Sequence, residues 1–263
     1  MNSIFTKTLR EKRWFIVGWG VGLFVLAAVM VLFYPSLKGT DAMEQLAAQM
    51  PEALQGFLGD YKLLSHFDTY IASQLFDIRL TIIVGIMITI LALGVSVSDE
   101  ASGRMKTFMS LPISRTKLFV QRWLAMVFII AVELLVMVLS VLALQGTVDA
   151  SIAVGELAKL YLMTLLVMVS MGSIMFAAGF AFGSRMIAMF VSVLVLLSGF
   201  ILTSFGPAVD WLHDYEFLSL FYYFNPVEVV QSGFKIENIL VLKAVALVTL
   251  VPAWLLFRRR DVR

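Results

Sequence analysis

Long apolar segments recur along the chain, separated by short polar stretches. A helix needs about 20 apolar residues to cross a hydrocarbon core of about 30 Å. Six segments reach this length, at residues 14–34, 80–97, 123–144, 160–182, 186–205 and 239–257. The pattern predicts an all-α integral membrane protein with six transmembrane helices, arranged as one domain over residues 1–263.

The fourth and fifth segments are separated only by Gly183, Ser184 and Arg185. Joined, they would form a helix far longer than the membrane is thick, so we predict two helices and a tight turn. The first segment is longer than the 7–15-residue apolar region of a signal peptide, and no small-residue cleavage pattern follows it. We therefore expect it to be retained as the first span.

Three further stretches show helical periodicity outside the spans. Residues 1–13 place Ile4, Phe5, Thr8 and Leu9 on one face, which predicts an amphipathic helix lying in the inner interface. Apolar residues recur at helical spacing in 43–58, and aromatic residues are frequent in 211–224. We interpret both as outer amphipathic or re-entrant pieces, or as loops packed on the bundle, and we interpret Asn225-Pro226 as a helix stop.

The distribution of charge predicts the orientation. The chain is 60% hydrophobic and only 14% charged, as expected for a protein with lipid as its solvent. With both termini cytoplasmic, the inner segments hold 14 of the 20 basic residues, which satisfies the positive-inside rule and requires an even number of spans. The net charge of +2 gives no reason to expect a nucleic-acid partner.

The residue inventory argues against catalysis by this chain. It has no GxxxxGK[ST] phosphate loop, no HExxH pair and no cysteine. Its two histidines, His66 and His213, both fall in predicted outer segments. We therefore expect no catalytic residue, metal site or cofactor in this chain.

The inner loop at 98–122 has the most informative pattern. A helix can start at Ser98 or Asp99, Pro112 ends whatever helix precedes it, and Ser114 can cap a new helix that enters the third span. Its apolar side chains need lipid headgroups or a partner protein to bury against; they are Met105, Phe108, Met109 and Leu111. A solvated basic linker is the alternative interpretation.

The string EASGRMKTFMSLPISRTKL resembles the loop of ABC-2 type exporter permeases. The matching positions are Glu100, Gly103, Leu111, Pro112, Ile113, Ser114 and Arg115, whereas Arg104 stands where the family usually has Thr. The resemblance extends to the amphipathic N-terminal stretch, the six spans and the basic tail. It implies the transmembrane half of a bacterial ABC exporter in the cell membrane.

In that family, two permeases, identical or homologous, pair and dock on two copies of a separate ATPase that binds ATP and Mg. The resemblance implies that the loop is the coupling element, formed by the seven matching residues with Arg104 and Phe108. It also implies that the first and fifth spans line the dimer interface. The apolar bundle suits an amphipathic, lipid-like, drug or peptide substrate. A stand-alone channel, a secondary transporter or a scaffold or sensor subunit are the alternatives.

Two further features inside the spans need an explanation. Glu133 is a carboxylate in the middle of the third span, where it either lines a cavity or packs between helices in a protonated or hydrogen-bonded form. Gly18/Gly22 and Gly179/Gly183 are GxxxG pairs, which allow close helix packing within one subunit or between two.

Overall fold

The computed structural model describes residues 3–37, 66–103, 105 and 113–260, and every regular element in these ranges is helical. The long helices are α2 (Arg13–Leu37), α6 (Ile78–Ser96), α9 (Arg115–Leu144), α10 (Val154–Phe182), α11 (Arg185–Phe205) and α14 (Ile236–Arg259). The short helices are α1 (Ile4–Glu11), α5 (Phe67–Leu75), α7 (Ser98–Ala101), α12 (Asp210–His213) and α13 (Pro226–Ser232). Single 3-10 turns lie at η2 (Gln145–Val148), η3 (Gly206–Ala208), η4 (Glu216–Leu218) and η5 (Leu220–Tyr223).

Each predicted span falls on one of the six long helices. Among the described residues, five of these are long and apolar enough to cross a membrane, and α6 contributes a shorter apolar helix at Ile82–Ser96. The all-α prediction is therefore confirmed. The count of six spans and their orientation remain predictions.

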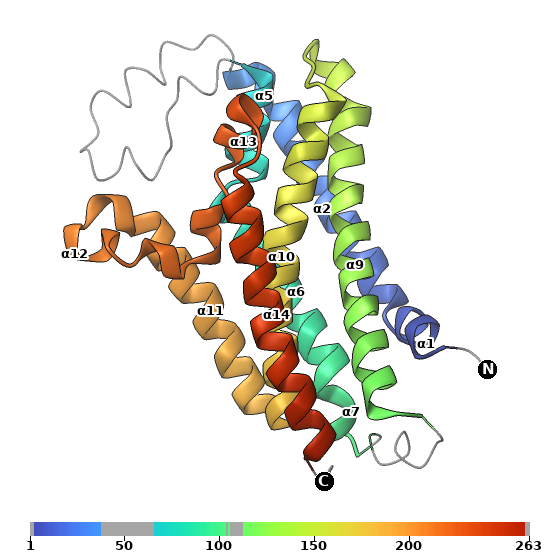
Figure 1. The fold of residues 1–263 in the computed structure, drawn as a ribbon. Coiled ribbons are helices and arrows are strands. Elements are labelled where there is room, and N and C mark those ends of the chain that lie inside the picture. Colours follow the sequence, from blue (N-terminus) through green and yellow to red (C-terminus); the bar gives the residue numbers. More distant parts are fainter. Residues whose placement is uncertain (1–2, 38–65, 104, 106–112, 261–263) are drawn as a thin grey trace.

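Helix α10 forms the centre of the bundle. It packs against α14, α6, α11 and α9, which surround it in Figure 1. In its apolar stretch 67% of the residues are buried, against 17% in those of α2, α11 and α14. The outer helices thus present much of their apolar surface away from the protein, as helices in lipid do.

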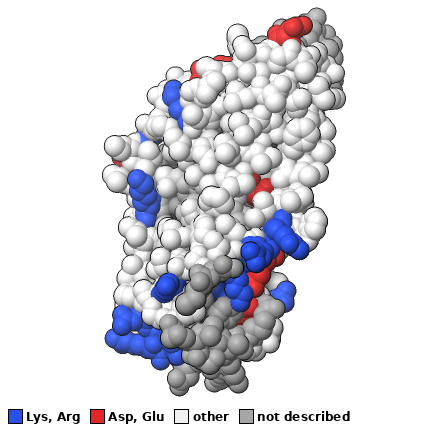
Figure 2. All heavy atoms as spheres, turned by 90° about the vertical axis from the view of Figure 1, so that its right-hand side faces the viewer, with Lys and Arg blue, Asp and Glu red and all other residues white. Residues whose placement is uncertain are grey.

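The two ends of the described chain lie at the same end of the bundle, together with α7 and the start of α9 (Figure 1). On the face shown in Figure 2, lysine and arginine side chains gather toward this end, below a broad uncharged region. The predicted inner segments therefore share one end of the molecule.

Helix boundaries follow from local capping. Ser114 accepts a hydrogen bond from the Lys117 amide at 3.2 Å and begins α9. At the tight turn between α10 and α11, Gly183 takes a left-handed conformation with φ of 61°, and Ser184 caps α11. The predicted division into two helices at this turn is confirmed.

The N-terminal helix is also confirmed as a helix, and it packs on α9. Ile4 and Thr8 are buried, the Phe5 amide donates to Gln121 Oε1 at 3.3 Å, and the Phe5 ring lies edge-on to Phe128 at 5.7 Å. Its predicted place in the membrane interface remains a prediction.

The predictions for the outer segments are partly wrong. Asn225-Pro226 does not stop a helix: Asn225 accepts from the Glu228 amide at 3.2 Å and Pro226 starts α13, because proline suits the first helical position, where its missing N–H is not needed. Helix α5 was not predicted. The aromatic segment 211–224 forms the end of α12 and the turns η4 and η5, and the segment 43–58 lies outside the described residues.

Candidate functional site: the loop after α6 and its supports

The loop that carries the family resemblance is fixed at its start by a buried ion pair. Asp99, in α7, and Arg122, in α9, are joined through Oδ2 and Nη2, and their side chains are 7% and 4% exposed. Arg122 Nη1 also donates to the Val95 carbonyl at 3.0 Å, near the end of α6. Because breaking a buried pair leaves an uncompensated charge, this contact ties α6, α7 and α9 together.

A second ion pair joins the loop to the end of α14. Arg260, the residue after α14, donates to both carboxylate oxygens of Glu100, at 2.9 and 2.6 Å. The Glu100 side chain is 8% exposed and that of Arg260 23%. A two-point contact of this kind fixes orientation as well as distance. The Arg260 guanidinium also lies against Gly183, where an added Cβ would collide with it.

Arg115, at the start of α9, contacts the end of α14. Its Nη1 donates to the Phe257 carbonyl at 2.9 Å and also to the Arg260 carbonyl, and its guanidinium lies over the Phe257 ring at 5.8 Å. These are carbonyls that the end of a helix leaves without partners inside the helix. Next to it, Trp254 Nε1 donates to Thr116 Oγ1 at 3.0 Å. The start of α9 therefore caps the end of α14.

An aromatic cluster lies beside this polar network. Phe119 of α9 packs edge-on against Phe176 and Phe180 of α10, each at 5.1 Å, and Phe257 of α14 lies edge-on to Phe180 at 4.7 Å. All four side chains are buried. Dense packing of this kind transmits displacement because it leaves little free volume.

The predicted coupling residues divide into three groups. Glu100, Ser114 and Arg115 are brought together around the ends of α7, α9 and α14. Gly103 has φ of 72°, a conformation that favours glycine, and Ile113 is half-buried against the core. The others lie outside the described residues: Arg104, Phe108, Leu111 and Pro112. Nearby, Met105 is fully buried.

Three residues of the network were missed by the sequence reasoning: Asp99, Arg122 and Arg260. The available signal was an acidic pair directly after one predicted span, an arginine directly before the next span, and a basic tail. Which acid pairs with which arginine depends on the packing of helices distant in the sequence. Residue spacing does not contain that information.

The network holds and orients protein segments, and it has no reactive group. Within the described residues, no three His, Cys, Asp or Glu side chains are close enough to hold a metal ion. The arginines are engaged with carboxylates and helix-end carbonyls, as in structural ion pairs. The network therefore connects the loop to the ends of the long helices. We call it the joint, and its polar residues are Asp99, Glu100, Arg115, Arg122 and Arg260.

Glu133 lies deep in the bundle, away from this joint. Its side chain is fully buried, and neither carboxylate oxygen has a hydrogen-bond partner among the described residues. Helix α2 comes close at Gly20, where an added Cβ would lie 3.4 Å from Glu133 Oε2. The structure therefore places Glu133 on α9 facing α2, and whether it lines a cavity or packs between helices remains a prediction.

The two GxxxG pairs differ in their surroundings. A Cβ added at Gly179 would collide with Ser96 of α6, so this glycine permits close packing of α10 on α6. A Cβ added at Gly18 or Gly22 would meet nothing within 4 Å among the described residues. Of the two alternatives for these pairs, the surroundings of Gly179 favour packing within the subunit, whereas Gly18 and Gly22 face outward from α2 and their role remains a prediction.

Comparison with known proteins identifies the family of the chain. No curated protein sequence matches the chain. The family model for ABC-2 family transporter protein matches residues 3–262, almost the whole sequence. The chain therefore belongs to the ABC-2 family of transporter proteins, and it is a multi-pass membrane protein of the permease type.

Proposed function

We propose that this chain is the transmembrane subunit of an ATP-driven exporter. In this proposal it crosses the bacterial cell membrane six times with both termini in the cytoplasm, and it pairs with a second copy or a homologous permease. Two copies of a separate ATPase bind ATP and Mg. The observation that carries the proposal is the joint described above, which connects the loop after α6 to α9, α10 and α14 through Asp99, Glu100, Arg115 and Arg260.

The joint gives a physical route from an ATPase to the bundle. An ATPase that moves the loop exerts force on α7, and the two buried or half-buried ion pairs pass this force to the starts and ends of three long helices. A displacement spreads through such a unit as rigid-body motion because packed interfaces do not deform continuously. Arg104, Phe108, Leu111 and Pro112 form the surface that meets the ATPase in this proposal, whereas Glu100 and Arg115 hold its base.

The outward face of α2 is the proposed contact with the second permease. Gly18 and Gly22 lie on it with open space in front of them, and small residues allow two helices to approach closely. Exposed apolar side chains flank them, including Val21 and Val25. Helix α11, the fifth long helix, is similarly exposed along Phe190, Leu194 and Leu197, and it completes the proposed interface.

The proposed cargo is an amphipathic molecule: a lipid-like compound, a drug or a peptide, taken from the cytoplasm or the inner leaflet. The long helices contain few charged residues, and such a bundle offers little to stabilise a bare ion in the membrane. This property also argues against an ion channel or an ion-coupled secondary transporter.

The experiment that tests the proposal is purification of the full chain from its native membrane, followed by identification of co-purifying proteins and measurement of ATP hydrolysis. We expect a protein with a phosphate loop, in about equal amount. The variant Leu111→Asp should lose most of the bound ATPase, whereas Trp211→Ala, an exposed residue of α12, should retain it. Purified chain that transports without any ATPase would instead identify a channel or secondary transporter.

A further inference from the structure

Glu133 is the one acidic residue in the middle of a long helix. The other acidic residues of the long helices, Glu156 and Glu237, lie in the first turns of α10 and α14. The Glu133 side chain is fully buried, and neither carboxylate oxygen has a hydrogen-bond partner in the described part of the chain. A buried carboxyl group without a partner is costly in a membrane, and such groups mark binding and transport sites.

Helix α2 covers Glu133 with a glycine. A Cβ added at Gly20 would lie 3.4 Å from Glu133 Oε2, so the backbone of α2 lies directly against the carboxyl group. Gly18 and Gly22 lie on the opposite face of α2, since two residues turn a helix by about 200°. Helix α2 therefore has no side chain on either of these faces here. Three glycines so close together also lower the stability of this part of the helix.

The part of α2 that covers Glu133 is loosely packed. No side chain in residues 13–22 is buried. The following part of α2 is firmly held, since the Tyr70 hydroxyl donates to the Met30 carbonyl at 2.8 Å. Four side chains of this part are buried: Leu23, Ala27, Val31 and Tyr34. Residues 13–22 can therefore move away from α9 while the rest of α2 stays in place, and this movement uncovers Glu133.

We infer that Glu133 binds the positively charged group of an amphipathic cargo, an organic cation with an apolar body, when residues 13–22 move aside. Trp19, the neighbour of Gly20, is half-buried, and its ring lies 6.1 Å from that of Phe15. Aromatic faces attract organic cations and also suit an apolar body. The inference names the charge of the cargo and therefore rests on the proposed function.

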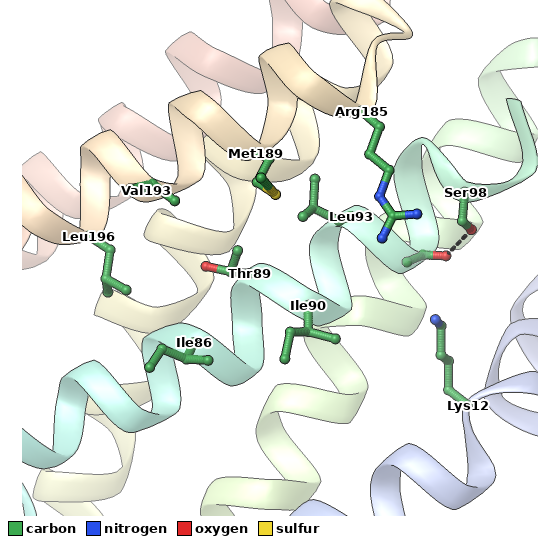
Figure 3. A pocket seen from close by; sticks show the side chains of 11 residues that line it. Lys12, Ile86, Thr89, Ile90, Leu93, Ser98, Arg185, Met189, Val193 and Leu196 are labelled. Carbon is green, nitrogen blue, oxygen red and sulfur yellow. Dashed lines mark hydrogen bonds between the residues drawn. The ribbon is translucent and has the colours of Figure 1, made fainter. Parts of the chain in front are cut away.

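Two other assignments fit the observations less well. A metal ion needs several ligands, and among the described residues Glu133 belongs to no group of three potential ligands. A groove of about 480 Å³ lies between α6 and α11 (Figure 3), where the side chains of Lys12 and Arg185 reach toward the end marked by Ser98. No carboxylate is among the described residues that line this groove, so its charge does not favour a cation.

Two ions of the same shape and opposite charge, tetraphenylphosphonium and tetraphenylborate, test the selectivity. Their binding to the purified full chain in zwitterionic nanodiscs is measured against empty nanodiscs. We expect saturable binding of tetraphenylphosphonium alone, weakened about 30-fold by Glu133→Gln, because this change removes the partner of a buried charge. Glu133→Asp keeps the charge and should bind more tightly than Glu133→Gln. The matched control Glu156→Gln should bind like the unsubstituted chain.

A second measurement locates the bound cation in the unsubstituted chain. Dicyclohexylcarbodiimide, an apolar reagent that attaches to carboxyl groups, should label Glu133 when α2 moves, and mass spectrometry identifies the labelled residue. Tetraphenylphosphonium should protect Glu133, and tetraphenylborate should not. No labelling, labelling that the phosphonium ion does not reduce, equal binding of the two ions, or full affinity in Glu133→Gln would each overturn the inference. Because these measurements use the chain without an ATPase, their failure is distinct from failure to co-purify one, which would overturn the proposed function.

Discussion

Arg260 binds both carboxylate oxygens of Glu100, at 2.9 and 2.6 Å, and so joins the end of α14 to a loop 160 residues earlier in the chain. The contact is fixed further by Arg115, which donates to the Arg260 carbonyl. Arg260 is thus held through its side chain by Glu100 and through its backbone carbonyl by Arg115. The loop, α9 and α14 meet at this point.

Exchange of the two charges tests this contact. Glu100→Gln or Arg260→Gln should each lower the free energy of unfolding by about 1–3 kcal/mol, because each leaves a charged group with unmet hydrogen bonds. The reversed pair, Glu100→Arg with Arg260→Glu, should recover part of that loss. Thermal unfolding of the purified protein measures both. A loss in the reversed pair equal to the sum of the two single losses would mean that the two side chains do not interact.

Loss of the Asp99–Arg122 pair should destabilise the folded protein more than loss of the Glu100–Arg260 pair. Both partners are more than nine-tenths buried, so Asp99→Asn leaves Arg122 charged in the interior, at a cost of about 3–5 kcal/mol. We expect the double variant Asp99→Asn/Arg122→Met to be more stable than Asp99→Asn alone. Comparison of folded yields and melting temperatures across the three proteins decides this; a double variant no better than the single one would contradict it.

Glu133 offers a test of an unpaired buried carboxyl group. Neither oxygen has a partner in the described part of the chain, and the isosteric Glu133→Gln removes the possibility of a charge while keeping the shape. We therefore expect Glu133→Gln to fold with unchanged or higher melting temperature. Glu133→Lys should lower the yield of folded protein, since the longer cation would sit opposite Gly20 and α2. A Glu133→Gln protein that inserts and folds but fails in transport would assign the carboxyl group to the transport cycle.

The glycine pairs provide matched substitutions with opposite expectations. Gly179→Leu should destabilise the isolated subunit, because the side chain would collide with Ser96 in a packed interface. Gly22→Leu should leave the subunit folded, because the space in front of it is open, and should weaken the proposed pairing of permeases. Melting temperature and oligomeric mass of the two variants separate these effects. Loss of folded subunit in Gly22→Leu would show that this face packs within the subunit.

The long helices were predictable because their apolar length is a local property. All six predicted spans overlap the helices α2, α6, α9, α10, α11 and α14. The cap at Ser114 was also predictable, since a serine before an apolar run satisfies backbone amides of its own helix. These features depend on interactions within one turn or one helix.

The partners of charged residues were not predictable. Asp99, Arg122 and Arg260 are paired by the packing of α6, α9 and α14, and spacing in the sequence does not contain this geometry. The two GxxxG pairs look alike in sequence, yet among the described residues a Cβ added at Gly179 would meet α6, whereas one added at Gly18 or Gly22 would meet nothing within 4 Å. The exception at Asn225-Pro226 is a local one: the same dipeptide can end one helix or begin the next, and here the Asn225 side chain caps α13.

The central place of α10 has a consequence for biosynthesis. Three long helices, α2, α6 and α9, precede it in the chain, and two, α11 and α14, follow it. Of the first three, α2 finds its main partner in α9, whereas α6 lacks its main partner until α10 has been made. During synthesis the early helices therefore enter the membrane without the centre of the bundle. The bundle can assemble around its centre only after α10, the fourth long helix, has been made.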